Sequence, residues 1–434
     1  MSSRTPVKLT EPPSEGRRTF HVDPCLAEAV PRESGEIGRE RERIRLKILH
    51  LFSDWKWTGP ADPVTSLCKE LEGRGHSVLF AYRKPPFPVE DSIEKRVRQL
   101  GIRATDRFRL DHAFKPSHPS AMVDSFRDLN GLAGFLRRER FDILNVHQSH
   151  DHILGGLAAR WAGHPVIVIR TDHKRDFLNP GLGNRLLISR LTDGIITFSE
   201  KGRRQDADRF QMPLERVARV RPALDLSQFD PRRPFKKMRD VFGIGPDETV
   251  IGMVARFQKY RKTEVFLEAI RLIVREFPKI KVLLVGRSSQ MEESVVKPMK
   301  RLGVEPWVIL GGYQTENYFD TLNSMDLFVF LVPGSDGTAR ALREAMAMGK
   351  PVIVTDRGML PELVEDGVSG IVAKETPESL AKAAMELLRD PRKRQEVGKA
   401  ALERARREFR QDRQAEEVET FYREMISLGK WRRR

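Results

Sequence analysis

The sequence predicts an α/β protein made of two similar halves, each a parallel sheet wrapped by helices. From Leu46 onward, short β-branched runs alternate with helix-length segments, and the same alternation resumes from Thr249. Between these stretches, residues 221–237 carry two prolines soon after Asp230, which indicates a linker. Because ligands of such sheets bind at the carboxyl ends of the strands, two halves joined in this way predict a cleft between them.

The expected strands are short apolar runs, as strands buried on both faces require. In the first half they are K-I-L-H-L-F (47–52), S-V-L-F-A-Y (77–82), I-L-N-V-H (143–147), P-V-I-V-I-R (165–170) and G-I-I-T-F-S (194–199). In the second half they are T-V-I-G-M-V-A (249–255), K-V-L-L-V-G (281–286), W-V-I-L-G-G (307–312), L-F-V-F-L-V (327–332) and P-V-I-V-T (351–355). The intervening segments fit helices, for example Val64–Glu72 and His152–Ala162.

The two ends of the chain differ from this pattern. Residues 1–44 are rich in Pro, Glu, Arg and Ser without periodicity, which predicts a disordered or loosely ordered tail. We expect an N-terminal Rossmann-like domain at 45–225 and a C-terminal one at 226–410. Residues 411–434 are expected to form a final helix that packs back toward the N-terminal domain.

Composition restricts the partners and the compartment. The formal net charge is +16, which predicts an anionic partner, although a solvated basic surface would have the same composition. Two cysteines, Cys25 and Cys68, are too few for a disulfide framework and fit a reducing cytoplasm, with Cys68 a buried thiol. No run of 18 apolar residues and no secretory signal is present, so we expect any membrane contact to be peripheral.

The most informative motif runs from Ser335 to Gly349. Asp336 and Glu344 are eight positions apart, about 12 Å if both were helical. Gly337 and Thr338 at the start of such a helix offer free N–H groups to a phosphate, and the deeper carboxylate suits ribose hydroxyls. The pattern predicts a sugar-nucleotide site; the alternative is an ordinary helix with Asp336 near its N-cap.

Several segments of the second half together resemble a known family. They are V-A-R-F-Q-K-Y-R-K, L-L-V-G, the acid–seven–Glu element with E-A-M-A-M-G-K-P-V-I, and V-E-D-G-V-S-G-I-V. The first half matches more loosely, through R-G-H-S-V, F-D-I-L-N-V-H and A-L-D-L-S-Q-F. From about Lys47 to Tyr422 the chain resembles the retaining GT-B glycosyltransferases of glycosyltransferase family 4, group 1. The resemblance implies two Rossmann-like domains facing each other across a cleft.

The same resemblance implies where the donor binds. The C-terminal domain would hold a nucleotide-diphosphate sugar, UDP- or GDP-linked, and the N-terminal domain a glycan or lipid-linked acceptor. Arg256 and Lys262 would grip the diphosphate, which gathers negative charge as the glycosidic bond breaks. Two fixed cations stabilise that charge without a metal or other cofactor.

Further donor residues follow from the family motif. Glu344 would accept from the ribose, Asp336 would lie near the sugar, and the loop at Gly312 and Tyr313 would set the base preference. This chain departs from the family by having Asp336 where a glutamate is usual, followed by G-T-A-R at 337–340 instead of the family's aromatic and glycine. The departure bears on the identity of the donor sugar. Arg340 would either add a phosphate contact or face solvent.

In the first half, Gly59, His147 and His173 are the candidate site residues. Gly59, beside Thr58, stands where the family has paired glycines, and the alternative is a plain turn. His147 matches a family histidine near the reacting sugar, and His173 matches another cleft position or simply ends a strand. The cluster of His147, His150, Asp151 and His152 also resembles a metal site, against which a polar loop and helix start is the favoured interpretation. Asp206 and Asp208 lie in a charged helical run, which predicts a solvated face.

Two basic, apolar segments suit an anionic membrane surface: 92–115 and L-G-N-R-L-L-I-S-R-L at 182–191. The alternative is that each faces its own core. The resemblance implies a metal-independent hexosyltransferase of cell-surface glycan or glycolipid assembly, and we expect it in the cytoplasm, with the basic segments favouring the inner face of the membrane. A sugar-nucleotide epimerase and a catalytically silent sugar-nucleotide binder remain alternatives. Charge alone suggests nucleic acid, and no recognition motif supports it.

Overall fold

The computed structural model describes residues 45–57, 59–87, 89, 92–111, 119–173, 178–333 and 339–431. The predicted tail at 1–44 and the residues Asp336, Gly337 and Thr338 lie outside the described residues. The described part belongs to one compact unit that begins at Arg45. It contains two parallel sheets, as the alternation of strands and helices predicted.

The first sheet has seven strands in the order β3-β2-β1-β4-β5-β6-β7, and the described pairs are parallel. Its strands are β1 (Lys47–Phe52), β2 (Ser77–Tyr82), β3 (Ala104–Thr105), β4 (Ile143–Val146), β5 (Ile167–Thr171), β6 (Gly194–Thr197) and β7 (Val217–Arg219). All five predicted strands are present, with ends that differ by one or two residues. The short strands β3 and β7 were not predicted.

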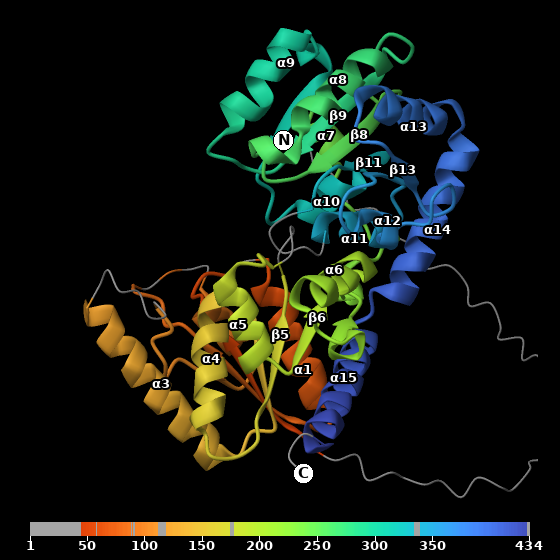
Figure 1. The fold of residues 1–434 in the computed structure, drawn as a ribbon. Helices are drawn as coiled ribbons and strands as arrows, with labels where there is room; N and C mark the ends of the chain where they lie inside the picture. The colour runs from red at the N-terminus through yellow and green to blue at the C-terminus, as the bar shows by residue number, and fades with distance from the viewer. Residues whose placement is uncertain are drawn as a thin grey trace, which may run out of the picture. The chain divides into compact units, whose positions relative to one another are not determined.

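Helices cover both faces of this sheet (Figure 1). On one face, α1 (Ala61–Gly73) and α15 (Gln411–Trp431) pack on Ile48, Phe52 and Ile143; Cys68 is buried there. On the other face, α3 (Pro119–Glu139) and α4 (Ser149–Trp161) pack on the alternate strand residues. The remaining helices of this half are α2 (Ile93–Gln99), α5 (Leu182–Leu191) and α6 (Glu200–Phe210).

The second sheet has six parallel strands in the order β10-β9-β8-β11-β12-β13. They are β8 (Thr249–Val254), β9 (Ile280–Val285), β10 (Val308–Gly312), β11 (Leu327–Phe330), β12 (Val352–Thr355) and β13 (Ile371–Ala373). One face is covered by α8 (Thr263–Ile273) and α13 (Pro377–Arg389), and the other by α11 (Arg340–Ala347) and α14 (Pro391–Glu408). Shorter helices are α7 (Met238–Val241), α9 (Lys297–Leu302), α10 (Tyr318–Asn323) and α12 (Leu360–Leu363).

Two connections join the halves. The predicted linker is held to the second half, because Leu224 and Phe229 are buried in its core and the Leu224 N–H donates to the Phe409 carbonyl at 2.9 Å. The chain then returns through α15, blue in Figure 1, which lies against α1 of the first half. There the Asn145 side-chain amide donates to the Tyr422 hydroxyl at 2.5 Å. None of the described helices combines the length and apolarity that a membrane span needs.

Candidate active site

The donor end of the second half is built where β8 and β9 finish. Gly286 directly follows β9 with a φ of +144°, and a Cβ on it would lie 1.9 Å from the Ala255 carbonyl oxygen. Only glycine therefore allows the two strand ends to approach this closely. The Gly286 N–H in turn donates to the Gly312 carbonyl at 2.8 Å, which ties the end of β10 to the same edge.

A cavity of about 230 Å³, here called the arginine cavity, opens at this edge. The described residues that line it include four arginines and no aspartate or glutamate. The lining residues are Val254, Ala255, Arg256, Arg261, Val285, Gly286, Arg287, Tyr313, Gln314, Tyr318, Phe330, Arg340 and Ala341. Such a concentration of guanidinium groups without lining carboxylates suits a diphosphate.

The two predicted diphosphate ligands differ in their position. Arg256 lines the arginine cavity with an exposed side chain, two residues after β8 ends. Lys262 is also exposed, but it is not among the described lining residues; it is the N-cap of α8, with a left-handed φ of +59°. A non-glycine residue in that conformation is strained, and such strain is concentrated at functional sites. Arg261, which the sequence analysis missed, lines the cavity and donates from Nη1 to the Val332 carbonyl at 2.6 Å.

Glu344 is buried and held from two sides. The Tyr318 hydroxyl donates to its Oε2, and Arg340 Nε donates to its Oε1 at 2.7 Å. Burial, with the Glu344 carboxylate next, raises the pKa of Tyr318 well above its usual value, so the phenol stays a donor. A carboxylate has about four lone-pair sites, so Glu344 keeps acceptor capacity for ribose hydroxyls.

Arg340 also reaches the first half, through its Nη1 to Asp62 Oδ2 at 2.7 Å. Burial would lower the pKa of Arg340, but the carboxylates of Glu344 and Asp62 raise it overall. Arg340 is therefore held between two carboxylates and is not free for a phosphate, although 41% of its side-chain surface is exposed. It also belongs to a second cavity, of about 310 Å³, that residues of both halves line, among them Gly59 and Asp62.

Helix α11 begins at Arg340, after Ala339 with a left-handed φ of +50°. Asp336 lies outside the described residues, so its separation of about 12 Å from Glu344 stays a prediction.

Gly312 ends β10 with a φ of +65°. Tyr313 follows it, and the Arg287 guanidinium lies 4.3 Å from the centroid of the Tyr313 ring. This pair offers a flat face to a nucleobase.

In the first half, a polar cavity of about 430 Å³ lies at the carboxyl ends of β1, β4 and β5. Its described lining is Ser53, Asp54, Pro60, Asp111, His147, Gln148, Ser149, His150, Arg170 and His173. The two predicted histidines, His147 and His173, therefore line the same cavity. They are joined by a third, His50 of β1, which the sequence analysis missed.

The contacts of Asp151 and His152 favour a polar loop and helix start over a metal site at the histidine cluster. Asp151 caps α4 instead: the Gln148 N–H donates to its Oδ1 at 2.6 Å and the Ser53 N–H to its Oδ2 at 3.2 Å. His152 is buried in the first turn of α4, with Nε2 2.7 Å from the Thr192 hydroxyl. Within the described ranges, no group of three or more His, Cys, Asp or Glu side chains is arranged so that it could hold a metal ion.

The prediction of a solvated face was wrong for Asp206. Helix α6 turns Gly202, Asp206, Ala207 and Phe210 inward, so Asp206 is buried while Asp208 is exposed. Burial, and next the Asp172 carboxylate, raise the pKa of Asp206 to about 7. The charged run K-G-R-R-Q-D-A-D-R-F shows no apolar pattern that would mark this buried face, because Gly202, Asp206 and Ala207 are small or acidic.

Two sequence models of known families match the chain. The model described as Glycosyl transferases group 1 matches residues 234–404, and the model described as Glycosyltransferase Family 4 matches residues 59–228. The chain belongs to glycosyltransferase family 4, group 1. The resemblance seen in its motifs is thereby confirmed, and the enzyme is a glycosyltransferase.

Individual relatives agree with this assignment. The N-acetyl-alpha-D-glucosaminyl L-malate synthase of Bacillus anthracis is 25% identical over 369 residues, which cover 83% of this glycosyltransferase and 93% of that protein. The D-inositol 3-phosphate glycosyltransferase of Corynebacterium kroppenstedtii is 24% identical over 323 residues, covering 71% and 68%.

Solved structures show the same fold. A glycosyltransferase from Rickettsia africae superimposes with a TM-score of 0.74 at 14% identity, over 88% of this chain and 99% of that one. Anabaena HepE in complex with UDP gives 0.70 at 18% identity, over 86% and 98%. The glycosyltransferase therefore has the predicted GT-B fold, with two Rossmann-like domains.

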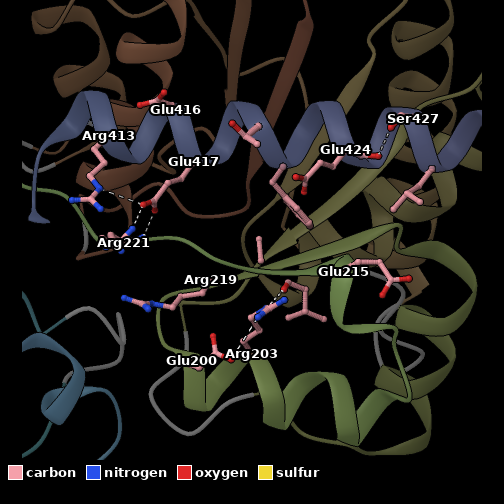
Figure 2. Close-up of a pocket in the computed structure, with 15 residues that line it drawn as sticks. Glu200, Arg203, Glu215, Arg219, Arg221, Arg413, Glu416, Glu417, Glu424 and Ser427 are labelled. Atoms are coloured by element: carbon pink, nitrogen blue, oxygen red, sulfur yellow. Dashed lines mark hydrogen bonds and ion pairs between the residues drawn. The ribbon is translucent and has the colours of Figure 1, made fainter.

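A further cavity, of about 980 Å³, has none of the predicted site residues among its described lining residues, several of which are labelled in Figure 2. It runs between α15, the edge strand β7 and α6, and four arginines and five glutamates line it. Several of these charges satisfy one another, as in the ion pair of Arg221 with Glu417 and that of Arg413 with Glu417 at 3.6 Å. Because the charges nearly balance, this groove does not select a nucleotide diphosphate as the arginine cavity does.

Proposed function

We propose that this glycosyltransferase moves a hexose from a UDP- or GDP-linked donor to an acceptor hydroxyl, with retention of anomeric configuration. The observation that carries the proposal is the arginine cavity beside the fixed carboxylate of Glu344. The complexes of HepE with UDP and UDP-glucose support a uridine donor by likeness of fold. The names of the malate and inositol-phosphate relatives support a small hydroxylated acceptor as well as a glycan or lipid-linked one.

In the proposed reaction, the bond from the anomeric carbon to the diphosphate oxygen breaks while the acceptor oxygen bonds to the same face. The acceptor proton passes to the leaving diphosphate, so no separate base is needed. Arg256, with Lys262 nearby, stabilises the charge that develops on the leaving group. Glu344 anchors the ribose, and Asp336 and His147 are proposed to orient the sugar.

Three measurements on the full chain test this function. A thermal-shift screen against UDP, GDP, ADP and their sugars identifies the donor, because a ligand that binds only the native state raises the melting temperature. NMR of the product then reports whether the new linkage keeps the donor's anomeric configuration. Conversion of the donor without any acceptor would instead indicate an epimerase, and tight binding without turnover a silent binder.

Chelation should leave turnover unchanged. The proposed leaving-group charge is met by arginine and lysine side chains, so no divalent ion is required at the diphosphate. We expect initial rates in excess EDTA within about twofold of those in Mg²⁺. A loss of activity on chelation that added Mg²⁺ or Mn²⁺ restores would contradict the metal-independent proposal.

We propose that α5 makes the membrane contact of this glycosyltransferase. Leu182 and Leu186 lie one turn apart on α5 with 88% and 62% of their surfaces exposed, and the exposed Arg185 lies between them. In the other predicted segment, α2 turns Ile93 and Val97 into the core, which favours the alternative interpretation there. The α5 surface has the composition of a helix that lies on an anionic bilayer. This location suits a lipid-linked acceptor of cell-envelope assembly.

A double variant tests the α5 surface. Leu182→Glu with Leu186→Glu should abolish co-sedimentation with phosphatidylglycerol-containing vesicles, because it removes apolar insertion and adds like charge. The matched control is Leu310→Glu, which changes a half-exposed leucine on β10 of the second half. If both variants bind these vesicles equally, α5 is not the membrane contact. The same conclusion follows if the wild type sediments only with neutral vesicles.

A further inference from the structure

Three imidazoles form a continuous chain across the ends of β1 and β4 and the residues after β5. His50 Nδ1 lies 3.0 Å from His147 Nε2, and His147 Nδ1 lies 3.0 Å from His173 Nε2. The ring centroids are 5.3 Å apart in both pairs. All three side chains are buried, on three adjacent strands of the sheet.

These rings are neutral. Burial lowers the pKa of His50 to about 3 and that of His173 to about 3, and burial followed by the neighbouring His173 and His50 lowers the pKa of His147 well below its usual value. Each ring therefore carries a single N–H, on one nitrogen or the other.

Two hydrogen bonds between neutral rings impose one shared tautomer. If His50 donates from Nδ1, His147 must donate from Nδ1 to His173 Nε2, and His173 then carries its proton on Nδ1. If the direction reverses, all three rings carry their proton on Nε2. No mixed arrangement keeps both bonds, because a hydrogen bond needs one donor and one acceptor. The three histidines thus form a two-state unit.

The ends of the chain differ in what surrounds them. His50 Nε2 and His173 Nδ1 are buried and have no hydrogen-bond partner among the described residues. Both nitrogens of His147 are used by its neighbours, so His147 has none left for a sugar unless a bond of the chain breaks. His173 is a described lining residue of the polar cavity, whereas His50 is not, so of the two unpartnered nitrogens only His173 Nδ1 belongs to a residue at the cavity.

We infer that His50 is a positioning residue: through His147 it fixes the tautomer of His173, whose Nδ1 hydrogen-bonds a hydroxyl group of the acceptor. The inference rests on the proposed function, since it assigns the polar cavity to the acceptor. A neutral imidazole end suits a hydroxyl, which accepts from the Nδ1–H of one state or donates to the bare Nδ1 of the other, so the shared tautomer decides which role the acceptor hydroxyl takes. His147 is the link in this chain, and it can orient the sugar directly only when one of its two bonds to the neighbouring rings breaks.

The decisive measurement is nitrogen NMR of the full chain labelled with ¹⁵N-histidine, assigned by single-histidine variants. The N–H and lone-pair nitrogens of a neutral imidazole are distinguished directly, and the chain has only 10 histidines. We expect His50, His147 and His173 to show one common tautomer in the wild type. His50→Leu should convert His147 and His173 to a tautomer mixture, whereas His50→Asn, which keeps a polar group at the Nδ1 position, should preserve it. Different tautomers among the three wild-type rings would overturn the inference, even if His50→Leu does not fold.

Kinetics separate positioning from simple destabilisation. With the donor and acceptor that give the highest wild-type rate in the screen above, His50→Leu should raise the acceptor KM about tenfold and leave the donor KM unchanged. His50→Asn should restore most of this loss, and a shift in donor KM of the same size would show a general structural effect instead. If no pair supports transfer by the wild type, the proposed function fails, and the tautomer measurement still decides the inference.

Discussion

Replacing Arg256 with alanine is expected to lower kcat at least about a hundredfold with little change in the melting temperature. Removal of one group that stabilises a developing oxyanion costs on the order of 3 kcal/mol of transition-state stabilisation. Arg256 is the strongest candidate because it lines the arginine cavity, is exposed to it, and has no ion-pair partner among the described residues. Its loss therefore leaves no buried charge behind, so we expect folding to be spared.

Two further variants sharpen this prediction. Arg256→Lys keeps the charge but not the planar fork that binds phosphate through two bonds, so a partial recovery of kcat is expected. For Lys262, asparagine is the better replacement than alanine, because asparagine tolerates the left-handed backbone found there and removes only the ammonium group. We expect Lys262→Asn to lower kcat about a hundredfold as well.

The matched control is Lys259→Ala. Lys259 is an exposed lysine on the same turn, three residues before Lys262, and is not a lining residue of the arginine cavity. Steady-state kinetics at saturating donor should leave this variant near wild type. Unchanged turnover in both Arg256→Ala and Lys262→Asn would eliminate the proposed role of these cations. A large loss in Lys259→Ala would show that general positive charge, and not the fixed pair, attracts the donor.

The sequence predicted those features that depend on neighbouring residues and missed those that depend on packing between elements. The longer buried strands were predictable, because short runs rich in apolar and β-branched residues alternate with helix-length segments. The strands β3, β7 and β13 have two or three residues each, too few to form a pattern. Asp206 was misjudged because only the packing of α6 shows which side of a charged helix turns inward.

Contacts between distant segments could not be read from the sequence at all. Arg340 and Asp62 are 278 positions apart, and no spacing rule connects them. His50 is a single histidine within an apolar strand, which no motif marks as functional. Its partners, His147 and His173, follow two other strands, and only the packing of β1, β4 and β5 side by side brings the three rings together. The family motif supplied Arg256 and Glu344, whereas Arg261 and Tyr318 came only from the geometry.

The largest effect on stability is expected at Arg170, on β5. Its side chain is almost completely buried, with Nη1 3.8 Å from Asp151 Oδ1 and with the Asp172 and Asp206 carboxylates close enough to influence it. Removing one partner from a buried ionic cluster typically costs about 3–5 kcal/mol, because the remaining charges stay uncompensated. We therefore expect Arg170→Met to lower the free energy of unfolding by about that amount at pH 8.

The sign of the pH dependence identifies the cause. Burial raises the pKa of Asp151 to about 7, as it does for Asp206, and in both cases Arg170 opposes this shift. Because these folded-state values exceed the ordinary aspartate pKa of about 3.9, the native state binds more protons, and both groups lower stability as the pH rises from about 4 to 7. Without Arg170 both pKa values rise further. At pH 6 the two carboxyls are then mostly protonated, so the loss should shrink there.

Urea unfolding of wild type and variant at pH 8 and pH 6 measures this difference, and comparison at each pH cancels the contribution of the buried histidines. Arg190→Met, at an exposed arginine of α5, is the matched control and should stay within about 0.5 kcal/mol of wild type. Arg170→Met combined with Asp206→Asn should recover part of the loss at pH 8, because it removes one of the uncompensated carboxylates. An equal loss at both pH values, with no recovery in the double variant, would mean that Arg170 stabilises the fold through packing and not through its charge.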